Sequence, residues 1–535
     1  MRQTSIFVIA IILFFIFSSC SSCRYVATKE RNISPYSFGL ATAKDGLERY
    51  QVLVKTHKAA VKAGLNVDYS GIDTIKLEIP VKPSRIPLTK INDFKGCVFV
   101  IKNTTNDTYL FDKKVEGEPI VVDKRLIDLG NFRSMDSLRR GKCLLIIQDE
   151  NLWVANRKGH SYGHTRKDIL LIENGVAKNS VIMPYNNDYS KPKCTFIRLD
   201  NDSLILKNLT IEREPGCTFL TNITLIVGND DVRIMNVNVH TPANKLIDDR
   251  GFLIRNCTNV TMDNVRIDGT YSQLNHSGYG VSLDNVWNFN VTRLYGKANW
   301  GIFGNNNVNT ARIENSTINR FDIHCYGRDI SFKNVHFVNL YNGYASVYGT
   351  ITYNNCTFTD FVPVLNGGSY NANVAHDVEF NNCVFNASPK KRYLIRMANL
   401  NDAPNSRHEL AEKCLPNVRI KNLTVNMTGG ESNFYILYGK LESKNASSIG
   451  GLSNITIDGL TVNSDDGTPV KGVSLCNVEI QTKVPVECQI NNVTVNQTVK
   501  GITAKSSQRE FATLKANLPL KGGTISMKNV MNLKQ

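Results

Sequence analysis

The 535-residue sequence predicts an all-β protein, a right-handed single-stranded parallel β-helix that begins with a capping helix and strands. A short phrase recurs from about residue 196, of the form apolar, any, Asn, apolar or small, any, apolar. Its copies lie about 19 to 28 residues apart in the middle of the chain, which is typical of one solenoid coil. An amphipathic helical pattern precedes them and would cover the apolar end that a solenoid otherwise exposes.

Residues 1–20 have the features of a lipoprotein signal peptide. A basic residue, an apolar run and small residues precede Cys20, which we expect to become the lipidated first residue, although Cys23 is a second candidate. The apolar run is short for a membrane-spanning helix. We therefore expect an outer-membrane lipoprotein, at the cell surface or the periplasmic face, held by a lipid anchor. Residues 21–44 would form its tether.

Residues 45–195 are expected to form an N-terminal cap and the first coils. A helical pattern begins at Asp45, a plausible N-cap, and ends at Gly64, a helix stop signal. A segment at 162–168 is either a basic loop beside a groove or, as we favour, a solvated turn before a strand. The predicted strands of this region are Thr74 to Val81, Cys97 to Lys102 and Cys143 to Gln148.

Residues 196–500 contain the repeated phrase and are predicted to form the β-helix, with 501–535 closing its C-terminal end. Asn at the centre of the phrase tolerates left-handed backbone angles and can hydrogen-bond its counterpart in the next coil. Cysteines also recur in similar strand contexts, which predicts mainly buried thiols, with one or two disulfides whose partners the sequence does not assign. The central residues are Asn208, Asn236, Asn264, Asn288, Asn315, Asn334, Asn355, Asn382, Asn422 and Asn492, with Gly459 as a variant.

The net charge of +16, from 63 basic and 47 acidic residues, predicts attraction to polyanions. Nucleic acid and acidic polysaccharide are the two obvious classes. An exported chain rarely meets nucleic acid, so we expect an acidic polysaccharide as partner and no nucleic acid. Outside the processing region, no Cys or His residues have the spacing of a zinc site.

One predicted strand carries four adjacent polar side chains on one face: Arg320, Asp322, His324 and Tyr326. The next repeat places three polar side chains opposite its apolar ones: Tyr344, Ser346 and Tyr348. If these are consecutive coils, the two polar faces stack into one patch. This patch is the predicted active site.

The chain resembles parallel β-helix proteins of the pectate-lyase-like superfamily. The N-terminal helix and the Asn-centred phrase carry this resemblance, over about residues 45–500. Within the superfamily it is most similar to Bacteroides polysaccharide lyases that act on glycosaminoglycans. The resemblance implies an endo-acting lyase that cleaves chondroitin sulfate, dermatan sulfate or hyaluronan by β-elimination at uronic acid. The calcium-binding carboxylates of pectate lyases are not recognisable. The sequence therefore shows no required cofactor and leaves calcium as the one candidate.

β-Elimination needs a donor that neutralises the uronate carboxylate, a base for the C5 proton and an acid for the departing O4. We assign Arg320 and Arg328 as the cations for the carboxylate, His324 as the base, and Tyr326, Tyr344 or Tyr348 as the acid or a second base. Asp322 would orient His324 or pair with Arg320. The predicted substrate-binding residues are Arg328, Asp322, Tyr344, Lys297, Asn299 and His276.

Two other functions remain open, and we expect a monomer in each case. A glycoside hydrolase would need paired carboxylates, for which Asp322 and Asp329 are unfavourably placed on different faces or in a turn. A non-catalytic glycan-binding lipoprotein would need only a basic groove and aromatic side chains.

Overall fold

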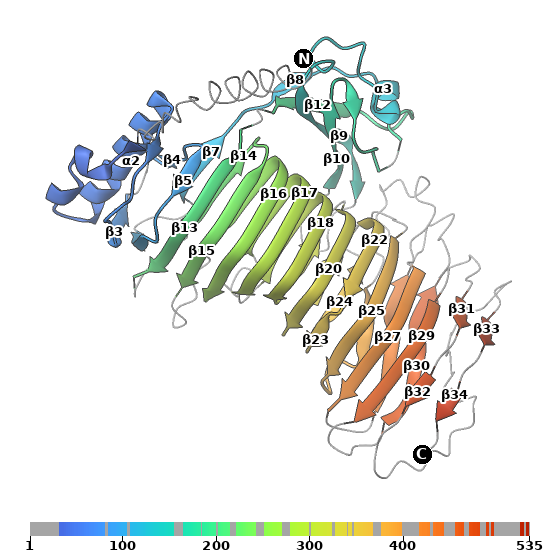
Figure 1. Cartoon of the computed structure of the whole chain (residues 1–535). Helices are drawn as coiled ribbons and strands as arrows, with labels where there is room; N and C mark the ends of the chain where they lie inside the picture. The colour runs from blue at the N-terminus through green and yellow to red at the C-terminus, as the bar shows by residue number, and fades with distance from the viewer. Residues whose placement is uncertain are drawn as a thin grey trace, which may run out of the picture.

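The computed structural model confirms the parallel β-helix and its N-terminal capping helix (Figure 1). It describes residues 32–80, 84–103, 108–154, 164–182, 184–199, 202–214, 221–241, 251–269, 279–298, 301–323, 327–339, 341–344, 347–366, 376–398, 417–428, 432–442, 455–464, 470–481, 488–491, 494–496, 525–528 and 531–533. Within this part of the chain, no helix is long and apolar enough to cross a membrane.

The cap begins with short elements and one long helix. The helix α2 (Gly46–Ala63) has both predicted ends: Asp45 accepts a hydrogen bond from the Glu48 N–H, and Gly64 is left-handed at φ 66°. The other elements of this region are β1 (Asn32–Ile33), η1 (Pro35–Phe38), η2 (Leu40–Thr42), β2 (Asn66–Val67), β3 (Thr74–Ile79), β4 (Ile86–Pro87), β5 (Ile91–Asp93), β6 (Val98–Asn103) and β7 (Thr108–Lys114). The described part of the predicted tether therefore contains β1, η1 and η2, and Leu40 is buried in the core.

The coils stack through parallel pairing of strands from successive turns, so that their apolar side chains form one continuous interior. Their strands are β13 (Leu204–Arg213), β14 (Thr221–Val227), β15 (Val232–Thr241), β16 (Phe252–Gly269), β17 (Tyr279–Ala298), β18 (Gly301–Ile318), β19 (Phe321–Ile323), β20 (Gly327–Val338), β21 (Tyr341–Tyr344), β22 (Val347–Asn354), β23 (Thr357–Thr359), β24 (Val362–Asn366), β25 (His376–Ala387), β26 (Tyr393–Ala398), β27 (Asn417–Met427), β28 (Ser432–Glu442), β29 (Ile455–Ser464) and β30 (Val470–Gln481).

Parallel pairing continues into the predicted closing segment. There β33 (Ile525–Lys528) pairs with β31 (Cys488–Asn491), and β34 (Met531–Leu533) pairs with β32 (Thr494–Asn496). Six cysteines are buried free thiols, as expected: Cys97, Cys143, Cys194, Cys257, Cys356 and Cys383.

Left-handed residues form ladders at the coil corners, as the repeated phrase predicts. The nine predicted Asn residues from Asn208 to Asn422 all have positive φ, as does Gly459, whereas Asn492 lies outside the described residues. The amide of Asn236 donates to Asn208 (3.0 Å), and that of Asn264 donates to Asn236 (2.9 Å).

Asn288 belongs to a different ladder from the one predicted. Its amide donates to Asn259 (2.8 Å), and the strand register puts Arg293, also left-handed, beside Asn264. The local phrase is the same in both corners, so only the register between strands separates the two ladders.

A separate antiparallel sheet is inserted between β7 and β13, within the region predicted to be cap and first coils. Its strand order is β11-β10-β9-β12-β8. We call it the inserted sheet, and it lies beside the middle coils (Figure 1). Its elements are β8 (Glu118–Ile120), α3 (Lys124–Leu129), β9 (Lys142–Val154), β10 (His164–Glu173), β11 (Val176–Ala177) and β12 (Pro192–Arg198). The predicted strand from Cys143 to Gln148 is thus in this sheet and not in a coil.

Candidate functional site

The predicted alternation holds in β19. Phe321 and Ile323 point into the core, and Arg320 and Asp322 lie on the other side of the strand. Both polar side chains are nevertheless buried, with Arg320 4% and Asp322 1% exposed. A charged pair at this depth must be matched internally, because an unpaired buried charge is strongly unfavourable.

Arg320, Asp322 and Tyr279 form a compact polar group, which we call the Arg320 cluster. The Arg320 Nε donates to the Asp322 carboxylate (2.5 Å), and a terminal guanidinium nitrogen also contacts it. The Tyr279 hydroxyl donates to the same carboxylate (3.1 Å), and the Gly343 N–H donates to its other oxygen (2.7 Å). Of the two roles expected for Asp322, pairing with Arg320 is observed.

Two glycines make room for this cluster. A Cβ at Gly304 would lie 2.3 Å from the Tyr279 ring, and one at Gly301 would lie 2.5 Å from the Arg320 side chain. Gly304 is also the register partner of Asp322 in the preceding coil. The absence of side chains at these positions therefore lets Tyr279 reach Asp322 across an intervening coil.

Tyr344 was predicted to bind substrate, but it lies in the core. The register of β19 and β21 aligns it with the interior Ile323, and it is 1% exposed. Its hydroxyl accepts from the Asn342 amide (2.7 Å) and bonds the Tyr353 hydroxyl (2.9 Å). Burial raises the pKa of Tyr344 well above its ordinary value. An interior tyrosine in this network cannot contact a glycan, so the prediction is wrong for this residue.

Tyr348 and Arg328 lie on a different strand of the coil from the Arg320 cluster. They are register partners in β20 and β22 and continue a column that includes Trp287. Trp287 packs against an apolar cluster of the inserted sheet. The Arg328 guanidinium donates to the Ser180 carbonyl (2.9 Å) and hydroxyl (3.2 Å), which occupies it at this interface.

The Tyr348 hydroxyl is buried, which disagrees with its predicted role as acid or base. Burial raises its pKa; the nearby Arg166 charge opposes this rise and Asp168 adds to it. A tyrosine that acts as a base needs a lowered pKa, whereas the surroundings of Tyr348 raise its pKa. Tyr348 and Arg328 are therefore not stacked on the Arg320 cluster in one patch.

The remaining predicted residues divide into two groups. Lys297 lies near the end of β17 and is exposed. The others lie outside the described residues: His324, Tyr326, Asn299, His276 and the lipidation candidate Cys20.

A buried charged group in the inserted sheet was not anticipated from the sequence. Arg166 and Asp168 form an ion pair (3.2 Å), and the Tyr185 hydroxyl donates to Asp168 (2.9 Å). The Arg166 guanidinium stacks 3.7 Å from the centre of the Tyr185 ring. Burial raises the pKa of Asp168, although Arg166 opposes the rise. The interpretation of 162–168 as a solvated turn is wrong for Arg166 and Asp168. The only sequence signal for this buried pair was the alternation Arg-x-Asp before an apolar run.

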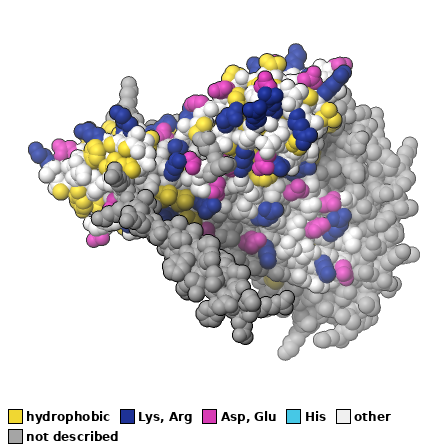
Figure 2. Space-filling view, turned by 45° about the horizontal axis from the view of Figure 1, so that its top comes forward, with side chains coloured by type: hydrophobic (Ala, Val, Ile, Leu, Met, Phe, Trp, Pro, Cys, Tyr) yellow, Lys and Arg dark blue, Asp and Glu magenta, His cyan; other side chains and the backbone are white. Residues whose placement is uncertain are grey.

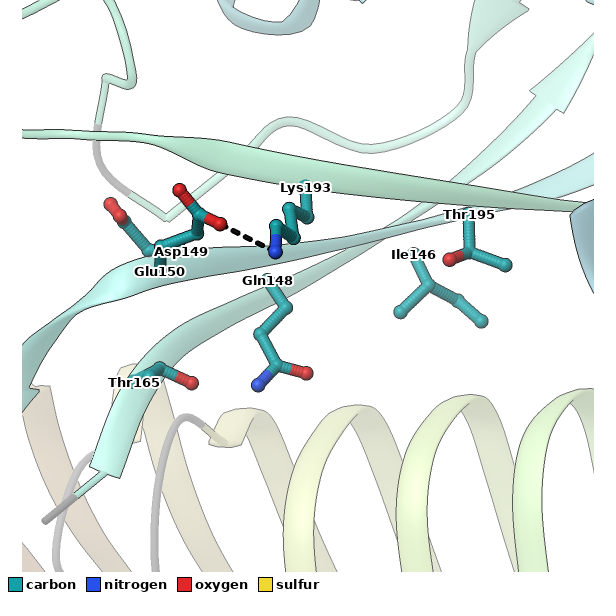
Figure 3. A pocket seen from close by; sticks show the side chains of 7 residues that line it. All are labelled: Ile146, Gln148, Asp149, Glu150, Thr165, Lys193 and Thr195. Atoms are coloured by element: carbon teal, nitrogen blue, oxygen red, sulfur yellow. Dashed lines mark ion pairs between the residues drawn. The ribbon is translucent and has the colours of Figure 1, made fainter. Parts of the chain in front are cut away.

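The inserted sheet also lines a pocket of about 470 Å³ (Figure 3). Lys193 and Glu150 form an ion pair on its wall (2.5 Å). On the same sheet Lys167 reaches Asp284 of β17 (3.4 Å), so the pocket adjoins the contact between the sheet and the coils. The lining residues are Ile146, Gln148, Asp149, Glu150, Thr165, Lys193 and Thr195. This lining offers hydroxyl, amide and charged groups suited to a polar ligand.

Charge on the face shown in Figure 2 is mixed, with Lys and Arg side chains interspersed with Asp and Glu. Within the described ranges, no three His, Cys, Asp or Glu side chains gather into a possible metal site. The net positive charge is therefore not concentrated into one basic field on this face.

Comparison with known proteins supports the fold alone. No protein-family model and no curated protein matches the sequence. Among solved structures, the chain is similar to the tailspike protein gp49 from Pseudomonas phage LKA1 (13% identity, TM-score 0.51, covering 88% of this chain and 81% of that one). It is also similar to the gp54 tailspike of Acinetobacter baumannii bacteriophage AP22, solved with a capsular saccharide (11% identity, TM-score 0.52, covering 88% and 76%).

Proposed function

We propose that this protein is an endo-acting lyase that cleaves an acidic polysaccharide, with glycosaminoglycans as the substrate class, by β-elimination at uronic acid. The observation that carries the proposal is the Arg320 cluster. It is a matched, buried ion pair with a half-buried tyrosine, built on the non-core side of a coil where two glycines leave space for it. The chain leads from β19 directly into His324 and Tyr326.

In this proposal His324 removes the C5 proton and Tyr326 protonates the departing O4. Arg320 changes role. Because Asp322 already neutralises it in the interior, we assign Arg320 as a positioning residue that fixes β19 and Tyr279, and not as the group that meets the uronate carboxylate. No step uses a metal.

Two further observations support a polysaccharide as substrate. The AP22 tailspike, on the same fold, was solved with a capsular saccharide, although its low identity to this chain makes the transfer of ligand class part of our proposal. The net charge of +16 favours an acidic polymer. The lipid anchor at Cys20 and the outer-membrane location belong to the same proposal, since an anchored enzyme would meet such polymers outside the cell.

The test is incubation with chondroitin sulfate, dermatan sulfate, hyaluronan and pectin, followed by absorbance of the unsaturated uronate. Early shortening of the polymer would support endo action. His324→Ala should abolish turnover. Tyr344→Phe is the control: it changes a core residue and should still give the unsaturated uronate. If none of the acidic polymers yields the chromophore, or if His324→Ala is as active as the parent, the lyase proposal is wrong.

A second candidate is a non-catalytic glycan binder, and one observation favours it. Asp322 neutralises the Arg320 charge, and the hydroxyl groups of Tyr348 and Tyr344 are buried, so three groups of the predicted chemistry do not face a substrate. A binder would retard the polymer in a gel without shortening it. Saturated ends after cleavage would instead indicate a hydrolase.

A further inference from the structure

Three tyrosines form an aromatic surface on the C-terminal coils, and we call it the tyrosine platform. Tyr393 lies on β26, and Tyr435 and Tyr438 lie on β28. The rings of Tyr393 and Tyr438 stack with centres 5.1 Å apart and planes 16° apart, and Tyr435 packs beside Tyr438 at 5.3 Å. Tyr438 is 38% exposed, and the other two are half-buried.

This stack differs from two buried aromatic stacks in the described part of the coils. The Phe337–Phe358 and Tyr353–Phe380 pairs have similar ring spacings, but all four residues are fully buried in the core. Core packing explains those pairs. Tyr393 also packs against the core, but core packing does not explain why the stack is open to solvent at Tyr438, where an exposed aromatic ring is the kind of surface that a partner covers.

The platform carries an available positive charge. Arg396 is exposed, is the register partner of Tyr438, and has no hydrogen bond or ion pair to any residue in the described part of the chain. The neighbouring basic residues are engaged elsewhere, since Lys391 donates to the Asp360 carbonyl and Arg392 donates to the Thr428 carbonyl. A guanidinium that is free to form paired hydrogen bonds suits a carboxylate or a sulfate.

The platform shares a sheet with the Arg320 cluster. The register runs from Asp322 through Gly343 and Val364 to Arg396 and then Tyr438. Neighbouring strands lie about 4.8 Å apart, so Arg396 is roughly 14 Å and Tyr438 roughly 19 Å from Asp322 along the stack. A polymer bound at the platform and lying along the axis of the β-helix would therefore extend over the strand that carries the Arg320 cluster.

We propose that Tyr393, Tyr435, Tyr438 and Arg396 form a binding subsite for an acidic polysaccharide, several sugar residues from the Arg320 cluster. The apolar face of a sugar ring covers the exposed tyrosine, and Arg396 pairs with a carboxylate or sulfate on the same or the next sugar. The choice of polymer rests on the proposed function, but binding at the platform does not require catalysis.

The test compares Tyr438→Ala and Arg396→Gln with a matched control, Tyr36→Ala. Tyr36 is also an exposed tyrosine, 48% exposed, but lies in the cap. Labelled chondroitin sulfate, as a long chain and as a tetrasaccharide, is titrated into each variant, and melting temperature reports folding. We expect Tyr438→Ala to weaken long-chain binding roughly 3- to 10-fold. Arg396→Gln should weaken it similarly and reduce its salt dependence, while Tyr36→Ala has no effect.

The outcomes separate this proposal from the lyase assignment. If long-chain affinity is unchanged in folded Tyr438→Ala and Arg396→Gln, the platform proposal is overturned, whatever the activity. If both variants lose affinity while the parent forms no unsaturated uronate, the platform is supported and the lyase assignment fails. A loss of affinity in Tyr36→Ala equal to that in Tyr438→Ala would also overturn the platform.

Discussion

Removal of the Asp322 carboxylate should destabilise the coil that carries β19. Asp322→Ala leaves the Arg320 guanidinium buried without its main counter-charge, and it deprives the Tyr279 hydroxyl and the Gly343 N–H of the acceptor they share. Both charged side chains are at most 4% exposed, so water cannot replace the lost contacts without a structural change.

The expected loss is about 3–5 kcal/mol, the range for breaking a buried ion pair from one side. Losing the carboxylate as an acceptor for Gly343 alone accounts for about 1–3 kcal/mol of the same kind. These figures overlap, because one carboxylate serves all three donors, so we do not add them. Arg320→Met should cost a similar amount, since it removes the guanidinium that pairs with this buried carboxylate.

The double variant Arg320→Met/Asp322→Leu provides the decisive comparison. It removes both charges together, and replacing a buried pair with apolar side chains is often nearly neutral. Urea unfolding followed by tryptophan fluorescence is suitable, because Trp287 lies on β17, the strand that also carries Tyr279. The reasoning is refuted if Asp322→Ala costs less than about 1 kcal/mol, or if the double variant loses the sum of both single changes.

Three more predictions concern the cap, the cluster and the corners. Burial lowers the pKa of His57 from 6.5 to about 4, so between these pH values the unfolded chain binds a proton at His57 and the folded cap does not. The free energy of unfolding should therefore fall by up to about 3 kcal/mol as the pH drops from 6.5 to 4. His57→Gln should reduce this loss in melting curves. Gly304→Ala should cost about 1–3 kcal/mol by pushing on the Tyr279 ring, and a similar cost in a Tyr279→Ala background would contradict this cause. Asn236→Ala should be about 1 kcal/mol less stable than Asn236→Gly. Both variants lose the hydrogen bonds to neighbouring coils, but only Ala is strained at φ 54°. Equal stability of the two variants would argue against backbone strain.

The fold was predictable because its signals are local and repeated. Asp45 and Gly64 mark the ends of α2 by hydrogen bonds and backbone angles within a few residues. The Asn corners likewise depend on a conformation that the residue itself favours. Asn288 shows the limit of such local signals. Its phrase correctly predicts a left-handed corner, but the Asn ladder that it joins depends on the register with Asn259, 29 residues earlier.

The site was predictable only within single strands. Alternation in β19 correctly put Phe321 and Ile323 inside. It failed at Tyr344, because β21 and β22 are separate strands, and the outward orientation of Tyr348 in β22 does not continue back across the break to Tyr344 in β21. No periodicity within the coils contains information about the inserted sheet, so the burial of the Tyr348 hydroxyl could not be inferred from them.

The inserted sheet narrows where a polymer can bind. It packs on the column of coil residues that includes Trp287, and its Ser180 accepts hydrogen bonds from Arg328. Protein therefore covers the face of the coils on which these two residues lie. The other sheet of the same coils, from β19 to β28, carries the Arg320 cluster at one point and ends in the exposed Arg396 and Tyr438. A sequence reading that treats all outward polar residues as one patch merges these two faces. Their separation assigns the first face to holding the inserted sheet. Under the proposed function, the second face is the surface available to an extended glycan, with the exposed Arg396 and Tyr438 at its end.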